Sequence, residues 1–133
     1  MKEDVGPGSA LVPGYAGHAD AVARRLSDAQ VRSWAGEKLT DLAERLDLGG
    51  VRERVDALLM RCEFADQQVV HAIEDERFGT PALAELVEGY DRKLIEAGRG
   101  CAAATAESLA DVIAALEAAF DARTAAIAEA LKG

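Results

Sequence analysis

Apolar residues recur at helical spacing along most of this chain, and the pattern is clearest over residues 80–131. One apolar run comprises Leu83, Val87, Tyr90, Leu94, Ala97 and Cys101. The next run comprises Leu109, Ile113, Leu116, Phe120, Ile127 and Leu131. Each run places one apolar stripe along a helix. The two runs are out of step near Gly98 and Gly100, so the segment forms either one helix with a stutter or two helices with a break.

The residues before Gly49-Gly50 predict a short helix followed by a longer one. Residues 18–26 form the short helix. Ser27 then opens a capping-box pattern with Gln30, and the helix that it starts is expected to run to about Leu46. Gly49-Gly50 is expected to end it. The buried face of this helix comprises Val31, Ala35, Leu39, Leu42 and Leu46, with Trp34 on its flank.

A further helix is expected over residues 51–78, and its end is the clearest boundary in the sequence. Gly79 suits the position after a helix, Thr80 is a good N-cap, and Pro81 fits the first helical turn because it lacks an N–H. The apolar stripe of this helix comprises Val51, Val55, Leu58, Cys62, Ala65, Val69 and Ile73.

These patterns predict an all-α, antiparallel helical bundle of three to four helices with a very long or kinked C-terminal helix. Residues 1–17, rich in glycine and proline, are expected to be a flexible leader or an arm that packs on a bundle. Residues 18–133 form a single helical-bundle domain. A continuous C-terminal helix would be about 75 Å long. Because one chain of this size cannot cover such a helix, its end would pack on a second copy.

Composition narrows the partners of this bundle. The formal net charge is −9, which disfavours nucleic acid and anionic membranes as partners. No apolar run approaches the ~18 residues of a membrane helix, and no secretory signal is evident. Two cysteines far apart in the sequence suit the reducing cytoplasm.

No recognised catalytic or metal-binding motif is present in the sequence. His71-x-x-Glu74 occurs once and in the reverse order of the Glu-x-x-His motif of di-iron bundles, so no metal or other cofactor is expected. Cys62 and Cys101 fall on apolar stripes, as inert core thiols do. Trp34-Ala35-Gly36 resembles the Trp-x-Gly signature of small secreted helical-hairpin proteins. In those proteins the motif marks a turn, whereas here the helical pattern continues through it.

A second apolar line lies opposite the main stripe of the helix over residues 51–78. Met60, Phe64 and Phe78 belong to this line. Because one buried face needs no second apolar line, these three residues are predicted to form the interface of a homodimer.

Two charged residues project toward apolar stripes. Asp66 is bracketed by apolar residues of its helix, and Arg123 takes an apolar position between Phe120 and Ile127. Buried charges are seldom left unpaired, so Asp66 and Arg123 are expected either to pair with each other or to line a polar cavity. In the second case Tyr90 and His71 would complete a ligand-binding site.

Two classes of function follow from the sequence. The first is a non-enzymatic protein acting in protein–protein interaction or assembly, as a homodimer. The second is a bundle that binds a small ligand or metal, with or without catalysis, around Asp66, His71, Tyr90 and Arg123.

Overall fold

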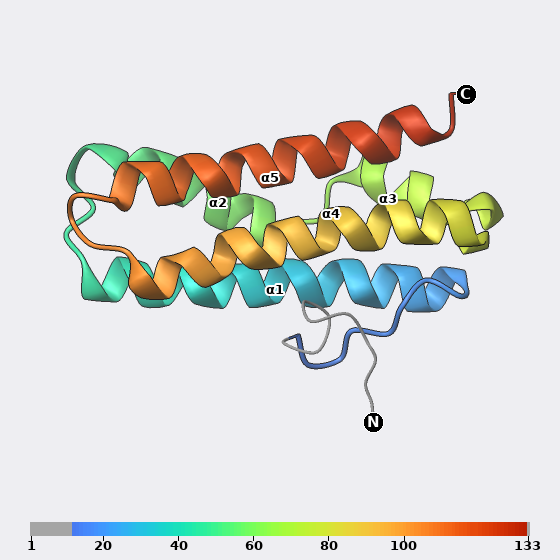
Figure 1. Ribbon diagram of the computed structural model, residues 1–133, viewed down its shortest axis with the longest axis horizontal. Coiled ribbons are helices and arrows are strands. Elements are labelled where there is room, and N and C mark those ends of the chain that lie inside the picture. Colours follow the sequence, from blue (N-terminus) through green and yellow to red (C-terminus); the bar gives the residue numbers. More distant parts are fainter. Residues whose placement is uncertain (1–11, 133) are drawn as a thin grey trace.

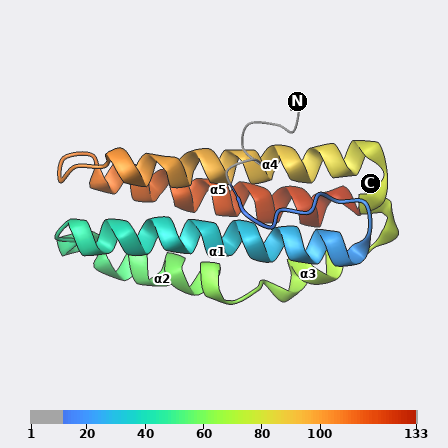
Figure 2. The same ribbon diagram turned by 90° about the horizontal axis from the view of Figure 1, so that it is seen from below.

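The computed structural model describes residues 12–132 and shows an all-α bundle, with no β-strand in that range (Figure 1). The α-helices are α1 (Ala21–Arg45), α2 (Arg52–Glu63), α3 (Gln67–Ile73), α4 (Pro81–Arg99) and α5 (Leu109–Ala130). Helices α2 and α3 follow one another in roughly the same direction and together occupy the place of one long helix (Figure 2). The chain therefore forms an up-down-up-down bundle, in which α1 packs on α2 and α4, and α5 packs on α4 and α3.

Short 3₁₀ turns lie in three of the four connections between these helices. They are η2 (Gly49–Val51), η3 (Glu76–Gly79) and η4 (Gly100–Ala103). The α1–α2 and α4–α5 connections lie at the same end of the bundle (Figure 1). Arg45 links these two connections, since its guanidinium donates to the carbonyl oxygens of Ala104, at 2.9 Å, and Cys101, at 2.6 Å.

The two helices expected before Gly49 are one helix, so the boundary predicted at Ser27 is wrong. Helix α1 starts at Asp20, whose carboxylate accepts a hydrogen bond from the Ala23 N–H at 2.8 Å. Ser27 lies inside α1, and its hydroxyl donates to the Gly17 carbonyl and accepts from the Ala16 N–H. Serine favours N-caps because its hydroxyl binds backbone groups, and here those groups belong to the preceding segment.

The single helix expected over residues 51–78 is also wrong, because the chain leaves the helical conformation between Glu63 and Gln67. Phe64 is extended (φ −110°, ψ 129°), and Asp66 is the N-cap of α3. Neither glycine nor proline marks this break in the sequence.

Of the two alternatives near Gly98 and Gly100, a stutter or a break, the structure shows the break. Helix α4 ends at Arg99, and the chain reverses through η4 before α5 begins at Leu109. Because the two halves form an antiparallel hairpin, no helix of about fifty residues exists in this range. The argument for a dimer based on that length therefore does not apply.

The apolar core is divided into two clusters. The larger cluster fills the bundle beside the α1–α2 and α4–α5 connections. The smaller cluster lies toward the other end and comprises Val69, Ile73, Phe78, Val87 and Ile127. Phe78 is completely buried there, so it is a core residue and not the surface residue that a dimer interface requires.

Part of the leader packs on the bundle. Val12 is buried in the larger cluster, and Tyr15 packs against it. Residues 1–11 lie outside the described range. No helix in the described part of the chain is both long enough and apolar enough to cross a membrane.

Candidate functional site

A layer of buried charges separates the two apolar clusters. The charged layer consists of Asp28 from α1, Asp91 from α4 and Arg123 from α5, which are 3%, 1% and 4% exposed. In α5, Phe120 belongs to the larger cluster and Ile127 to the smaller one, and Arg123 lies between them. Three helices thus present a charge to the interior at the same level of the bundle.

Arg123 holds the charged layer together. Its Nε donates to Asp91 Oδ1 at 2.6 Å, and its Nη2 lies 2.9 Å from Asp28 Oδ1. The contact with Asp28 is an ion pair by distance, but Asp28 Oδ1 accepts no hydrogen bond of acceptable angle from the described residues. The other oxygen, Asp28 Oδ2, accepts from Arg32 Nε at 3.0 Å. One acceptor of the layer is therefore only partly satisfied.

The segment that precedes α1 contributes further partners for Asp91. The Tyr15 hydroxyl donates to Asp91 Oδ2 at 2.8 Å. His18 Nε2 lies 2.7 Å from the Tyr15 oxygen and 3.4 Å from Asp91 Oδ2. Because the hydroxyl proton points to Asp91, we assign the Nε2–H tautomer to His18, which donates to Tyr15. The network thus runs from the leader to the middle of the bundle.

Burial and charge act in opposite directions on these groups. Burial alone would raise the pKa of Asp91, but the Arg123 charge, the nearby His18 ring and the hydrogen bonds from Tyr15 and Arg123 hold it below its ordinary value. Burial would lower the pKa of Arg123, but Asp91 and Asp28 raise it. Burial and the nearby Asp91 charge both raise the pKa of Tyr15. The tyrosine therefore stays protonated and can donate to Asp91.

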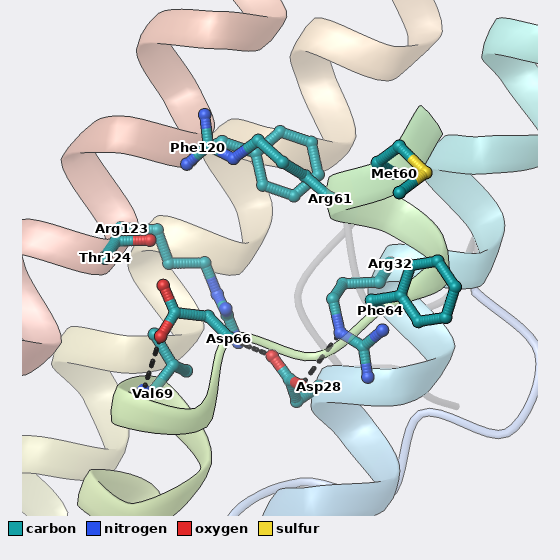
Figure 3. A pocket seen from close by; sticks show the side chains of 10 residues that line it. All are labelled: Asp28, Arg32, Met60, Arg61, Phe64, Asp66, Val69, Phe120, Arg123 and Thr124. Carbon is teal, nitrogen blue, oxygen red and sulfur yellow. Dashed lines mark hydrogen bonds and ion pairs between the residues drawn. The ribbon is translucent and has the colours of Figure 1, made fainter. Parts of the chain in front are cut away.

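A recess of about 290 Å³ opens onto the charged layer where α2 gives way to α3 (Figure 3). Its charged lining residues are Asp28, Arg32, Arg61, Asp66 and Arg123. The rest of the lining consists of Met60, Phe64, Val69, Phe120 and Thr124. The recess thus combines buried charges with aromatic and aliphatic walls, as ligand sites commonly do.

The helix ends beside the recess are held by side chains. Arg32 Nη1 donates at 3.0 Å to the carbonyl oxygen of Cys62, in the last turn of α2. Asp66 Oδ1 accepts from the N–H groups of Gln68, at 2.9 Å, and Val69, at 3.3 Å, at the start of α3. These bonds satisfy backbone groups that a helix end leaves without partners. The break is therefore a stabilised feature, and the recess lies beside it.

The pairing predicted between Asp66 and Arg123 is wrong, although both residues line the recess. Asp66 is exposed and serves as the cap of α3, whereas Arg123 pairs with Asp91 and Asp28. An aspartate on an apolar stripe marks a helix start in this case, because its carboxylate binds N–H groups of the first turn.

The other predicted site residues divide between the recess and the outer surface. His71 is exposed on α3. The Lys93 ammonium nitrogen lies over the ring of Tyr90 of α4, 4.7 Å from the ring centre. Neither residue lines the recess. Met60 and Phe64 do line it, and they remain 58% and 59% exposed. The predicted apolar surface and the predicted charged site thus overlap at the recess.

Sequence reasoning missed Asp28 and Asp91, although a signal for each is present. Asp91 lies four residues after Val87 and three before Leu94, which is a core position on its helix. Asp28 lies three residues before Val31. The pattern at Ser27 suggests a helix start, which would place Asp28 in an exposed first turn and not on a buried face.

The described residues show no assembled metal site. Within residues 12–132, no three His, Cys, Asp or Glu side chains come together in a way that would hold a metal ion. Both cysteines are buried and form no disulfide. Burial raises the pKa of Cys62 to about 11 and also raises the pKa of Cys101, so neither thiol is activated as a nucleophile.

Comparison of the chain with protein-family models, with curated proteins and with solved structures found no match. Function therefore has to be inferred from the recess and from the charged layer beneath it.

Proposed function

We propose that this protein is a non-enzymatic binding protein whose recess between α2 and α3 takes up a small amphipathic ligand. The observation that carries the proposal is the composition of the recess. A buried ion pair of Asp28 and Arg123 lies at its floor, and the exposed apolar side chains of Met60 and Phe64 lie at its rim. Ligand pockets are typically apolar concavities with a few convergent polar groups.

The break in the helix supports binding over a purely structural role for the charged layer. The recess lies where α2 gives way to α3, and Arg32 and Asp66, which line it, stabilise the two helix ends there. Phe64, the first residue after α2, is left largely exposed beside the opening. Contact with a ligand would remove its apolar surface from water, at a gain of about 25 cal/mol per Å².

Two-dimensional ¹H–¹⁵N NMR of the full chain tests the proposal with a panel of chemically distinct compounds. The probes are small amphipathic molecules that include carboxylates, amines, amino acids and neutral amides. We expect at least one class to shift the amide signals of residues 60–69 and 120–124 in a saturable manner. Shifts confined to other regions, or none with any class, would contradict the proposal.

A matched pair of variants shows whether such binding uses the recess. Phe64→Ala removes an exposed aromatic side chain from the rim. Val22→Ala removes a similarly exposed apolar side chain (64%) that does not line the recess. We expect the first variant to weaken binding and the second to leave it unchanged. Equal effects of the two variants would place the ligand elsewhere.

The homodimer predicted from the sequence remains a second proposal, supported by the exposure of Met60 and Phe64 on one surface. It corresponds to a role in protein–protein interaction or assembly, in the cytoplasm where two unpaired thiols are expected. Sedimentation velocity over a range of concentrations tests it. A dimer that dissociates in Phe64→Glu, but not in Val22→Glu, would favour assembly over ligand uptake. A monomer at all concentrations would remove this proposal.

A further inference from the structure

The recess presents both signs of charge to anything that enters it. Three arginines and two aspartates line it, namely Arg32, Arg61, Arg123, Asp28 and Asp66. Outside the lining, Asp91 pairs with Arg123, and Asp121 pairs with Arg61 at 2.9 Å. The whole group therefore holds three guanidinium groups and four carboxylates, which is close to neutral. A ligand with a single charge would pair with one of the two sets and leave the other without a partner on the ligand.

The polar groups at the floor are arranged as neighbouring acceptor and donors. Asp28 lies between Arg123 and Arg32 (Figure 3). Its Oδ1 is buried and accepts no hydrogen bond of acceptable angle from the described residues. In the same range, Arg32 Nη2 and Arg123 Nη1 have no hydrogen-bond acceptor. An additional donor would complete Asp28, and an additional carboxylate would match the guanidinium groups.

The walls of the recess set the rest of the ligand. Phe120, Val69 and Phe64 supply apolar surface, and Met60 adds a side chain that adapts to different shapes. The Arg61 guanidinium lies over the Phe120 ring, 4.9 Å from its centre, which keeps that arginine on one wall. With a volume of about 290 Å³, the recess is at the small end of ligand pockets.

We infer that the ligand is a small zwitterion with an apolar body, namely an α-amino acid with an aromatic or aliphatic side chain. Its ammonium group donates to Asp28, its carboxylate accepts from Arg32 and Arg123, and its side chain packs between Phe64, Val69 and Phe120. This assignment rests on the proposed function and specifies the class of ligand for the same recess.

Isothermal titration of the full chain with phenylalanine and two truncated analogues tests the inference. One analogue is 3-phenylpropionate, which lacks the ammonium group, and the other is phenethylamine, which lacks the carboxylate. Each analogue loses hydrogen bonds to a charged group, so we expect its Kd to be at least about tenfold higher than that of phenylalanine. Glutamate, which replaces the apolar side chain with a second carboxylate, is expected to bind no better than the analogues.

A substitution at the floor assigns the ammonium contact. Asp28→Asn keeps the size of the side chain and removes its charge. We expect this variant to raise the Kd of phenylalanine at least about tenfold while changing that of 3-phenylpropionate little or lowering it. Circular dichroism verifies that the variant is folded. If it is not folded, the analogue series on the unaltered chain decides the question alone.

The outcomes separate the ligand class from the proposed function. Binding of 3-phenylpropionate as tight as that of phenylalanine would overturn the zwitterion while leaving a ligand-binding recess in place. Binding of phenethylamine alone would likewise overturn the zwitterion, and it would indicate a cationic ligand for the recess. If neither phenylalanine nor any amino acid of the NMR panel binds, the inference is also overturned. The proposed ligand-binding function would be overturned only if the full panel of NMR probes also left the amide signals of residues 60–69 and 120–124 unchanged.

Discussion

Arg123 shows how strongly a single buried charge depends on its surroundings. It occupies an interior position of α5 and is neutralised by aspartates from two other helices, one of which is also held by Tyr15. Removing one member of such a group costs more than removing the whole group, because the charge left behind is buried without a partner.

A double-mutant cycle on Asp91 and Arg123 measures this dependence. We expect Asp91→Leu and Arg123→Leu each to lower the free energy of unfolding by about 3–5 kcal/mol, and the double variant to lose much less than the sum. Urea unfolding of the four proteins gives the coupling. Asp66→Ala is the control, since it should cost about 0.5–2 kcal/mol as a lost cap and be nearly additive with Arg123→Leu. Additive effects of Asp91 and Arg123 would contradict the pairing.

The stability of the protein in acid depends on the Asp91 carboxylate. The pKa of Asp91 is below its unfolded value of about 3.9, so its contribution is complete above about pH 4 and is lost as the pH falls through the folded pKa. As the pH is lowered below about 4, we expect the urea concentration at the unfolding midpoint to decrease. We expect this decrease to be less steep in Asp91→Asn than in the unaltered chain. Other carboxylates with lowered pKa, such as Asp75 (about 2) and Glu117, account for the slope that remains. Identical acid profiles would show that Asp91 does not contribute.

At the scale of the elements, the packing of Trp34 of α1 against α4 depends on Gly98. A Cβ atom built at this position would lie 2.5 Å from Cζ3 of Trp34, whereas one at Gly100 would meet nothing within 4 Å. Trp34 is buried and cannot move without disturbing the larger cluster. The absence of a side chain at Gly98 is therefore a packing requirement, although glycine is unfavourable within a helix.

Substituting the two glycines separates packing from helix propensity. Overpacking in Gly98→Ala costs about 1–3 kcal/mol, of which about 1 kcal/mol is recovered through helix propensity. A net loss of stability is therefore expected in thermal unfolding. Gly100→Ala adds a methyl group in open space and is expected to be neutral or slightly stabilising. Equal behaviour of the two variants would mean that Trp34 adjusts freely.

The elements also show what the sequence could predict. Pro81 correctly placed the start of α4, and the shift between the two apolar runs near Gly98 located its end as a break or a stutter, because proline and a change in apolar phase are visible in a sequence. The break between α2 and α3 is marked by neither glycine nor proline, and the cap residue Asp66 lies on an apolar stripe that continues past it. At this break Arg32 of α1 donates to the Cys62 carbonyl, a tertiary contact that a local pattern does not show.

Prediction of the candidate site was limited for the same reason. Arg123 is recognisable as a charge at a core position, and Met60 and Phe64 as apolar residues off the main stripe. The place where they meet depends on the helix break, whose local sign, the cap residue Asp66, also fits a charge on a buried stripe. Asp91 occupies the same kind of position as Arg123 and could have been found by testing every charged residue against its apolar neighbours three and four positions away.

At the scale of the whole molecule, stability is expected to be uneven. Helix α3 has only seven residues, is bounded by the break on one side and η3 on the other, and packs on the smaller cluster. Short helices depend on tertiary contacts, so this region should open more easily than the rest of the bundle.

Native-state hydrogen exchange monitored by NMR tests this expectation. Amides of α3 are expected to exchange with a lower opening free energy than those in the middle of α1 and α5. Binding of a ligand in the recess should slow exchange at the start of α3, because the recess includes Asp66 and Val69. Uniform protection across the described helices would indicate a single cooperative unit.

The charged layer has a consequence for how the helices find their alignment. The buried residues of α5 recur every three or four positions, and all of them except Arg123 are apolar. Sliding such a helix by one turn, about 5.4 Å, would replace many contacts with similar ones. It would also carry Arg123 away from Asp28 and Asp91 into an apolar cluster. The arginine therefore opens an energy gap between one arrangement of the bundle and its shifted alternatives, which the apolar contacts alone would leave closer in energy.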